Sequence, residues 1–212
     1  MFFKLPAMAL GLSLLFAVTA NAGVVYDNGA PANVDGFAFN NPSAADDFVL
    51  AAPTTLTGVT FWAFSNNAAN LANIGWAILA DAGAVPAAIL HSGLAVGASA
   101  IDTGVNIASN DVFEVNFVMP SIVLDGGTSY WLALDSGPIF QDQQVGFSGW
   151  VWTTNTTGDS SAAGQPGSWI ADGRGRDNAF QLISEVPEPA TLGLFGLGVA
   201  GIRLAARRRK SA

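Results

Sequence analysis

Most side chains in this sequence that could do acid–base or metal chemistry are carboxylates. Between the apolar stretches at its two ends, residues 23–185 carry fifteen aspartates and glutamates, two arginines and the single histidine, a formal charge of −13. The chain has no cysteine, and His91 lies in no nucleophile-elbow motif, so nothing points to nucleophilic catalysis. A hydrolase would need two of the carboxylates as acid and base, and no spacing singles out a pair. We therefore expect no catalytic residues and a protein that is not an enzyme.

The acidic charge also limits the partners. Six of the eight basic residues lie in the terminal stretches, which leaves no basic surface for nucleic acid. Oxygen ligands for Ca²⁺ are present in three segments, Asp46-Asp47, Asn110-Asp111 and residues 172–177. None of the three has the D-x-D-x-D-G spacing of a calcium loop. We expect no cofactor and no specific metal site, only weak, salt-sensitive attraction of Ca²⁺ by charge.

Tryptophan is the other residue type with a binding use. Alternation along the expected strands places Trp76 on the face of Ile74 and Ile78, which indicates a core position. Four tryptophans fall instead on the less apolar face of their strands: Trp62, Trp131, Trp150 and Trp152. Flat rings flanked by hydroxyls and carboxylates suit stacking on sugars, so these four are the candidate glycan-binding residues. The alternative is that loops or neighbouring strands cover the rings, as is usual for large aromatics.

Short β-strands would have to position all these side chains. Runs rich in Val, Ile, Phe and Trp are separated by turn signals such as Asp125-Gly126-Gly127. The runs are 45–50, 56–64, 74–80, 112–119, 129–134, 145–152 and 179–183. No long amphipathic helical stretch competes with them. The pattern predicts an all-β fold, a single antiparallel, jelly-roll-like β-sandwich of about eight or nine strands over residues 23–185.

The first 22 residues have the pattern of a secretory signal peptide. Lys4 is followed by an apolar core over residues 5–18, and Ala20-Asn21-Ala22 supplies the small-x-small pattern that signal peptidase requires. We predict cleavage after Ala22, with Ala20 and Ala22 as the recognised residues. An uncleaved N-terminal anchor is the alternative, although the apolar stretch is short for a membrane span.

The C-terminal end has three parts in a fixed order. A Val-Pro-Glu-Pro strip over residues 186–189 precedes an apolar stretch, residues 190–202, and then a basic tail. Consecutive X-Pro bonds keep the strip extended, and terminal arginines hold that end on the cytoplasmic side of a membrane helix. The expected sorting residues are Val186, Pro187, Glu188, Pro189, Arg207, Arg208, Arg209 and Lys210. The alternative is an ordinary C-terminal anchor without processing.

Together, the strip, the apolar stretch and the basic tail resemble the PEP-CTERM sorting signal. The resemblance covers residues 186–210 and implies an exosortase as processing partner, in a bacterium that makes extracellular polysaccharide. The segment is also labelled an ice-binding protein C-terminal domain, a label that implies no ice binding. Runs 44–50, 57–62 and 127–132 loosely resemble ectodomains found with this signal, which supports a β-sandwich and carries no binding residues.

These observations predict a non-enzymatic protein with three parts: a signal peptide (1–22), an ectodomain (23–185) and a sorting signal (186–210). It would pass through the inner membrane as an anchored intermediate and become a structural or adhesive protein of the cell surface or extracellular matrix. The alternative is a carbohydrate-binding module that holds extracellular polysaccharide on its outward tryptophans. A weaker alternative is a carboxylate-based hydrolase.

Overall fold

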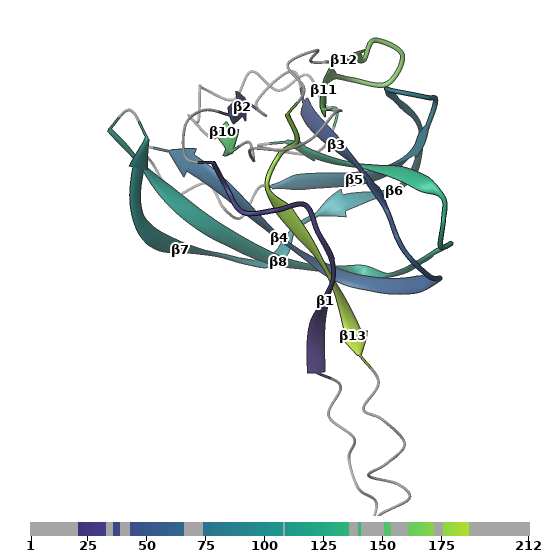
Figure 1. Ribbon diagram of the computed structural model, residues 1–212, viewed down its shortest axis with the longest axis horizontal. Helices are drawn as coiled ribbons and strands as arrows, with labels where there is room; N and C mark the ends of the chain where they lie inside the picture. The colour runs from purple at the N-terminus through teal and green to yellow at the C-terminus, as the bar shows by residue number, and fades with distance from the viewer. Residues whose placement is uncertain are drawn as a thin grey trace, which may run out of the picture. The chain divides into compact units, whose positions relative to one another are not determined.

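The computed structural model of the chain describes residues 21–32, 36–38, 43–65, 74–107, 109–135, 140, 151–153, 161–171 and 176–186 (Figure 1). These residues form thirteen β-strands and no helix, so the all-β prediction is confirmed. No helix in this described part is long and apolar enough to cross a membrane. The predicted signal-peptide core and sorting helix lie outside the described residues.

Two antiparallel sheets contain all thirteen strands. The first has the order β1-β13-β4-β10-β2, with β8 also paired to β4 and β7 paired to β8. Its strands are β1 (Asn21–Asp27), β2 (Gly36–Ala38), β4 (Thr54–Ser65), β7 (Val96–Ile107), β8 (Asn110–Leu124), β10 (Val151–Thr153) and β13 (Phe180–Val186). The second has the order β12-β11-β3-β9-β5-β6. Its strands are β3 (Ser43–Val49), β5 (Gly75–Asp81), β6 (Pro86–Leu94), β9 (Ser129–Asp135), β11 (Ser161–Gly164) and β12 (Ile170–Ala171).

The main core lies between the two sheets, as a sandwich requires. Alternate residues of β4, including Phe61 and Ala63, point inward from the first sheet, and Phe48 on β3 points inward from the second. The Phe48 ring meets that of Phe180, on β13, edge-on, with centroids 6.3 Å apart. The two-sheet antiparallel sandwich is therefore present. A jelly roll has eight strands, whereas the described residues form thirteen. The jelly-roll-like order of the strands therefore remains a prediction.

A second, smaller apolar cluster covers the outer face of the second sheet. Trp131 is its largest buried member, and Phe140 and Trp169 pack against it. The rings of Phe140 and Trp169 meet edge-on at 5.8 Å. This sheet is therefore apolar on both faces, a feature that decides the position of Trp131.

The first and last strands of the chain are neighbours. Strand β13 lies between β1 and β4, and Figure 1 shows β1 and β13 side by side at one end of the sheet. Residues 22–185 form one compact unit. The sheet that closes the sandwich ends at Val186, the first residue of the Val-Pro-Glu-Pro strip.

Candidate functional site

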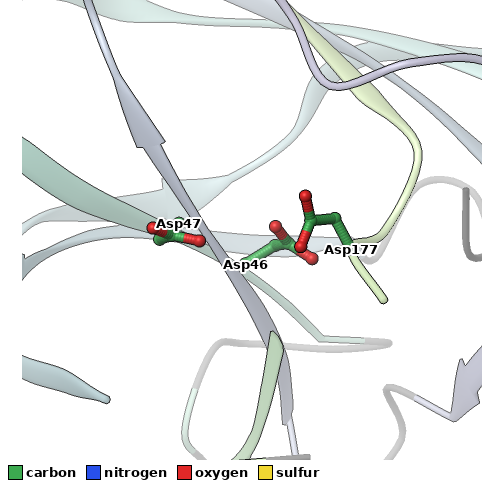
Figure 2. Close-up of side chains that lie close together, drawn as sticks. All are labelled: Asp46, Asp47 and Asp177. Atoms are coloured by element: carbon green, nitrogen blue, oxygen red, sulfur yellow. The ribbon is translucent and has the colours of Figure 1, made fainter. Parts of the chain in front are cut away.

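Three carboxylates converge where β3 approaches the segment that leads into β13. Asp46 and Asp47 lie on β3, and Asp177 precedes β13; one oxygen from each lies within 4.8 Å of the others (Figure 2). Two of the three acidic segments identified in the sequence are thus brought together. The third, Asn110-Asp111, lies at the start of β8 and is not a member of this cluster.

Asp46 is fully buried because it has the inward position of its strand. It alternates with Ala44 and Phe48, which face the main core, and its exposed fraction is 0%. The Asn28 side-chain amide donates to one carboxylate oxygen at 3.0 Å, and the backbone N–H of Asn178 donates to the other. Asn28 also donates to the Asn178 carbonyl at 3.0 Å. These bonds join the end of β1, the middle of β3 and the approach to β13.

Burial dominates the electrostatics of this carboxylate. Loss of hydration raises the pKa of Asp46 well above its usual value, and the Asn178 N–H offsets part of that rise. The negative charges of Asp177 and Asp47 raise the pKa further. A positive charge at this point would relieve all three carboxylates.

The described pairing between β3 and β11 ends beside the cluster. Strand β11 pairs with β3 from Ser43 to Asp46, and its first residue, Ser161, lies directly opposite Asp46. Figure 2 shows Asp46 and Asp177 on one side of β3 and Asp47 on the other.

Two buried polar side chains next to the cluster have no hydrogen-bond partner among the residues that the structure describes. The hydroxyl of Ser161, 2% exposed, has none, and neither atom of the fully buried Asn178 amide has one. Buried polar groups in native proteins are nearly always paired, so unpaired groups at one place need an explanation.

Two of the four predicted glycan-binding tryptophans are buried, and the prediction is wrong for them. Trp131 is 1% exposed. Alternation assigned it correctly to the face opposite the main core, but the second apolar cluster covers that face. Its indole N–H donates to Asp81 at 2.9 Å, which satisfies the only polar atom of the ring.

Trp152 is 0% exposed and lies in the main core. It pairs with Ala63, an inward residue of β4, so its face is opposite to the one predicted. The prediction assumed a strand over residues 145–152, part of which lies outside the described residues. The described strand begins at Val151. Alternation counted along the longer run therefore assigned the ring to the wrong face. Trp76, by contrast, is 1% exposed, which confirms its predicted core position.

Of the remaining two candidates, Trp62 is described and Trp150 lies outside the described residues. Trp62 is partly buried on the outer face of the first sheet, opposite Glu114 of β8. Beside it, the Thr60 hydroxyl donates to Asn116 at 2.6 Å, and the Asn116 amide donates to Glu114 at 3.2 Å. Of the predicted glycan-binding tryptophans that the structure describes, Trp62 is therefore the one that keeps an outward, partly accessible position.

The predicted sorting and cleavage residues lie at the limits of the described chain. Ala22 is in β1, and Val186 is the last residue of β13. Ala20 and the sorting residues from Pro187 onward lie outside the described residues. His91 is exposed on β6, the last strand of its sheet.

Comparison with known proteins identifies the C-terminal segment. The family model of the PEP-CTERM protein-sorting motif matches residues 185–210, which confirms the resemblance at the tail. The motif implies exosortase-dependent export with processing at the membrane. No curated protein and no solved structure matches the chain.

Proposed function

We propose that this chain is an exported structural or adhesive protein that reaches the cell surface or extracellular matrix after exosortase processing within residues 186–189. The observation that carries the proposal is the sorting motif over residues 185–210. It begins where the sandwich ends, since the last described pairing of β13 joins Ser184 to Leu56. A folded domain followed directly by a sorting signal suits a protein that is exported and then remains at the cell surface or in the extracellular matrix.

The processing can be tested by intact-mass measurement of the protein isolated from its native host. We expect a mature chain that begins at Gly23 and lacks the residues beyond about Pro189. As a control, replacing Arg207, Arg208, Arg209 and Lys210 with serine should leave the tail attached, because those charges hold the segment in the membrane. A wild-type mature chain that still contains Ala212 would contradict the proposal.

We further propose that the role is not catalytic. His91 lies exposed on a terminal strand of its sheet, away from any built site. The carboxylates that do converge include Asp46, whose oxygens already accept hydrogen bonds from Asn28 and Asn178. Polysaccharides incubated with the purified protein should keep their chain length, and release of oligosaccharides would contradict this part of the proposal.

A carbohydrate-binding role is the second candidate, and Trp62 is the observation that favours it. Its ring lies beside the row of Thr60, Asn116 and Glu114 on the outer face of the first sheet. If the ring stacks on sugar, Trp62→Ala should weaken glycan binding by about 1–3 kcal/mol, the range found for stacking on aromatic side chains. Val118→Ala, on the same face and 58% exposed, is the matched control. Equal affinity in wild type and Trp62→Ala would reject this role.

A further inference from the structure

We propose that Asp46, Asp47 and Asp177 bind one Ca²⁺ ion beside β3, at the end of its described pairing with β11, with oxygens from Ser161 and Asn178 completing its coordination. The proposal stands independently of the exported structural role. It also departs from the expectation of charge-driven binding without a site. Asp46 and Asn178 are 132 residues apart in the chain, so no local spacing could reveal this arrangement.

The separation of the carboxylates matches the size of a calcium ion. Ca²⁺ binds oxygen at 2.3–2.6 Å, so two ligands on opposite sides of one ion lie about 4.6–5.2 Å apart. One oxygen from each of the three aspartates lies within 4.8 Å of the others. Asp46 and Asp47 project from opposite faces of β3 (Figure 2), yet the 4.8 Å limit places one oxygen of each close enough to share an ion.

The unpaired polar groups point to a ligand independently of the acidic residues. Ser161 lies directly opposite Asp46 in an antiparallel pair, so both side chains are on one face with Cβ atoms about 4.5–5.5 Å apart. The Ser161 hydroxyl is 2% exposed and has no hydrogen-bond partner. A cation held by Asp46 would give that hydroxyl oxygen a partner.

Asn178 is the second such group. It follows Asp177 directly, and its backbone N–H already contacts Asp46. Its side chain is 0% exposed, and its amide oxygen has no hydrogen-bond partner among the described residues. A cation held by Asp46 and Asp177 would give that oxygen a partner.

The chemistry of the donors favours Ca²⁺ over other metals. All five proposed ligands are oxygens from carboxylate, hydroxyl and amide groups, which are hard donors without nitrogen or sulfur. Mg²⁺ demands near-ideal octahedral geometry, which side chains from three separate segments do not readily provide. Ca²⁺ accepts six to eight ligands in irregular geometry, so the five side chains leave only one to three positions for water.

The experiment is a titration of the full-length chain, purified in detergent and freed of metal with a chelator. Calorimetry with CaCl₂ should show one ion per chain at low and at high NaCl, and the thermal midpoint should rise with Ca²⁺ concentration. Asp177→Asn should weaken the affinity about tenfold or more, since losing even an outer partner of a ligand costs 10–100-fold. Glu185→Gln removes one exposed charge at the other end of β13 and should leave the affinity unchanged.

Terbium luminescence provides a readout that does not depend on stability. Trp131 lies directly opposite Asp47, so Tb³⁺ bound in place of Ca²⁺ would be close enough to accept energy from that indole. Excitation of tryptophan should give Tb³⁺ emission that Ca²⁺ abolishes and that Ser161→Ala weakens. Binding that vanishes at high salt, a loss of affinity equal in Asp177→Asn and Glu185→Gln, or absence of the emission would each overturn the proposal.

Discussion

Asn28 connects three strands through one buried side chain. Its amide nitrogen donates to Asp46 and to the Asn178 carbonyl, and its oxygen accepts from the Tyr26 hydroxyl at 2.8 Å. An equivalent amide–carboxylate bond lies on the surface, where Gln181 donates to Asp27 at 3.0 Å. The two bonds have the same length and differ in burial. Comparing them therefore measures how much burial adds to the stability that such a bond contributes.

Removing the buried member should be the more damaging change. Asn28→Ala leaves a buried carboxylate oxygen and a buried carbonyl without a donor, and each such group costs about 1–3 kcal/mol. Gln181→Ala should change the free energy of unfolding by less than about 0.5 kcal/mol, as is usual at exposed positions. Denaturant unfolding of both variants gives the comparison. Similar losses would mean that the Asn28 bonds add nothing to the stability of the fold.

The tryptophans provide a second test at the scale of single residues. Trp152 packs against Phe61 and Phe180 at centroid distances of 6.2 and 5.7 Å, and its N–H donates to the Ala179 carbonyl at 2.9 Å. Trp152→Ala should therefore cost about 3–5 kcal/mol of stability. Trp62→Ala, at a partly buried position, should cost about 1 kcal/mol. Unfolding curves that shift equally for the two variants would contradict this division into core and surface.

At the scale of elements, the turn between β8 and β9 packs against the loop that precedes β4. The Gly127 N–H donates to the Leu50 carbonyl at 2.8 Å, which brings the turn onto the chain at Ala52. A Cβ on Gly126 would lie 2.5 Å from the Ala52 Cα, whereas a Cβ on Gly127 would meet nothing within 4 Å. The two adjacent glycines therefore serve different needs: close approach at Gly126 and a left-handed φ of 71° at Gly127.

Substitution should separate these two needs. Gly126→Ala forces the turn away from the Ala52 backbone and should cost about 1–3 kcal/mol, as overpacking does. Gly127→Asn keeps a residue that tolerates the left-handed region and should cost less than about 1 kcal/mol. Thermal unfolding of both variants measures the difference, and a larger loss in Gly127→Asn would reverse the assignment.

Sequence patterns were informative for strands with a buried face and uninformative elsewhere. The runs 56–64 and 74–80 match β4 and β5 because their large apolar residues alternate or cluster. Strands β6 and β7 were not predicted, since residues 86–107 are mostly small or polar and most of them are exposed. Alternation also assigned Trp131 to the correct face, but it cannot show that a second layer covers that face. The acidic cluster was out of reach for the same reason, because pairing between distant segments creates it.

At the scale of the whole molecule, the order of strands connects folding to sorting. Strand β13 lies between β1 and β4, so the sheet is completed only when the last strand of the ectodomain has been made. The strand ends at Val186, and the sorting motif begins at residue 185. Residues 187–189 can span at most about 11 Å when fully extended. The folded body and the apolar stretch that follows Pro189 are thus separated by a very short tether.

This short tether leads to a prediction that rests on the proposed processing. If exosortase acts after the sandwich has folded, a bulky body so near the Val-Pro-Glu-Pro strip should hinder access to it. A flexible ten-residue Gly-Ser spacer inserted between Val186 and Pro187, directly after β13, lengthens the tether by up to about 35 Å and should raise the rate at which the tail is lost. The same spacer placed beside Gly83, in an exposed turn, keeps the added length away from the strip and should leave that rate unchanged. Pulse-chase labelling in the native host, with the mass shift of the tail as readout, compares the two insertions with wild type. Equal rates in all three chains would mean that the strip is processed before β13 joins the sheet, or that the folded body does not obstruct it.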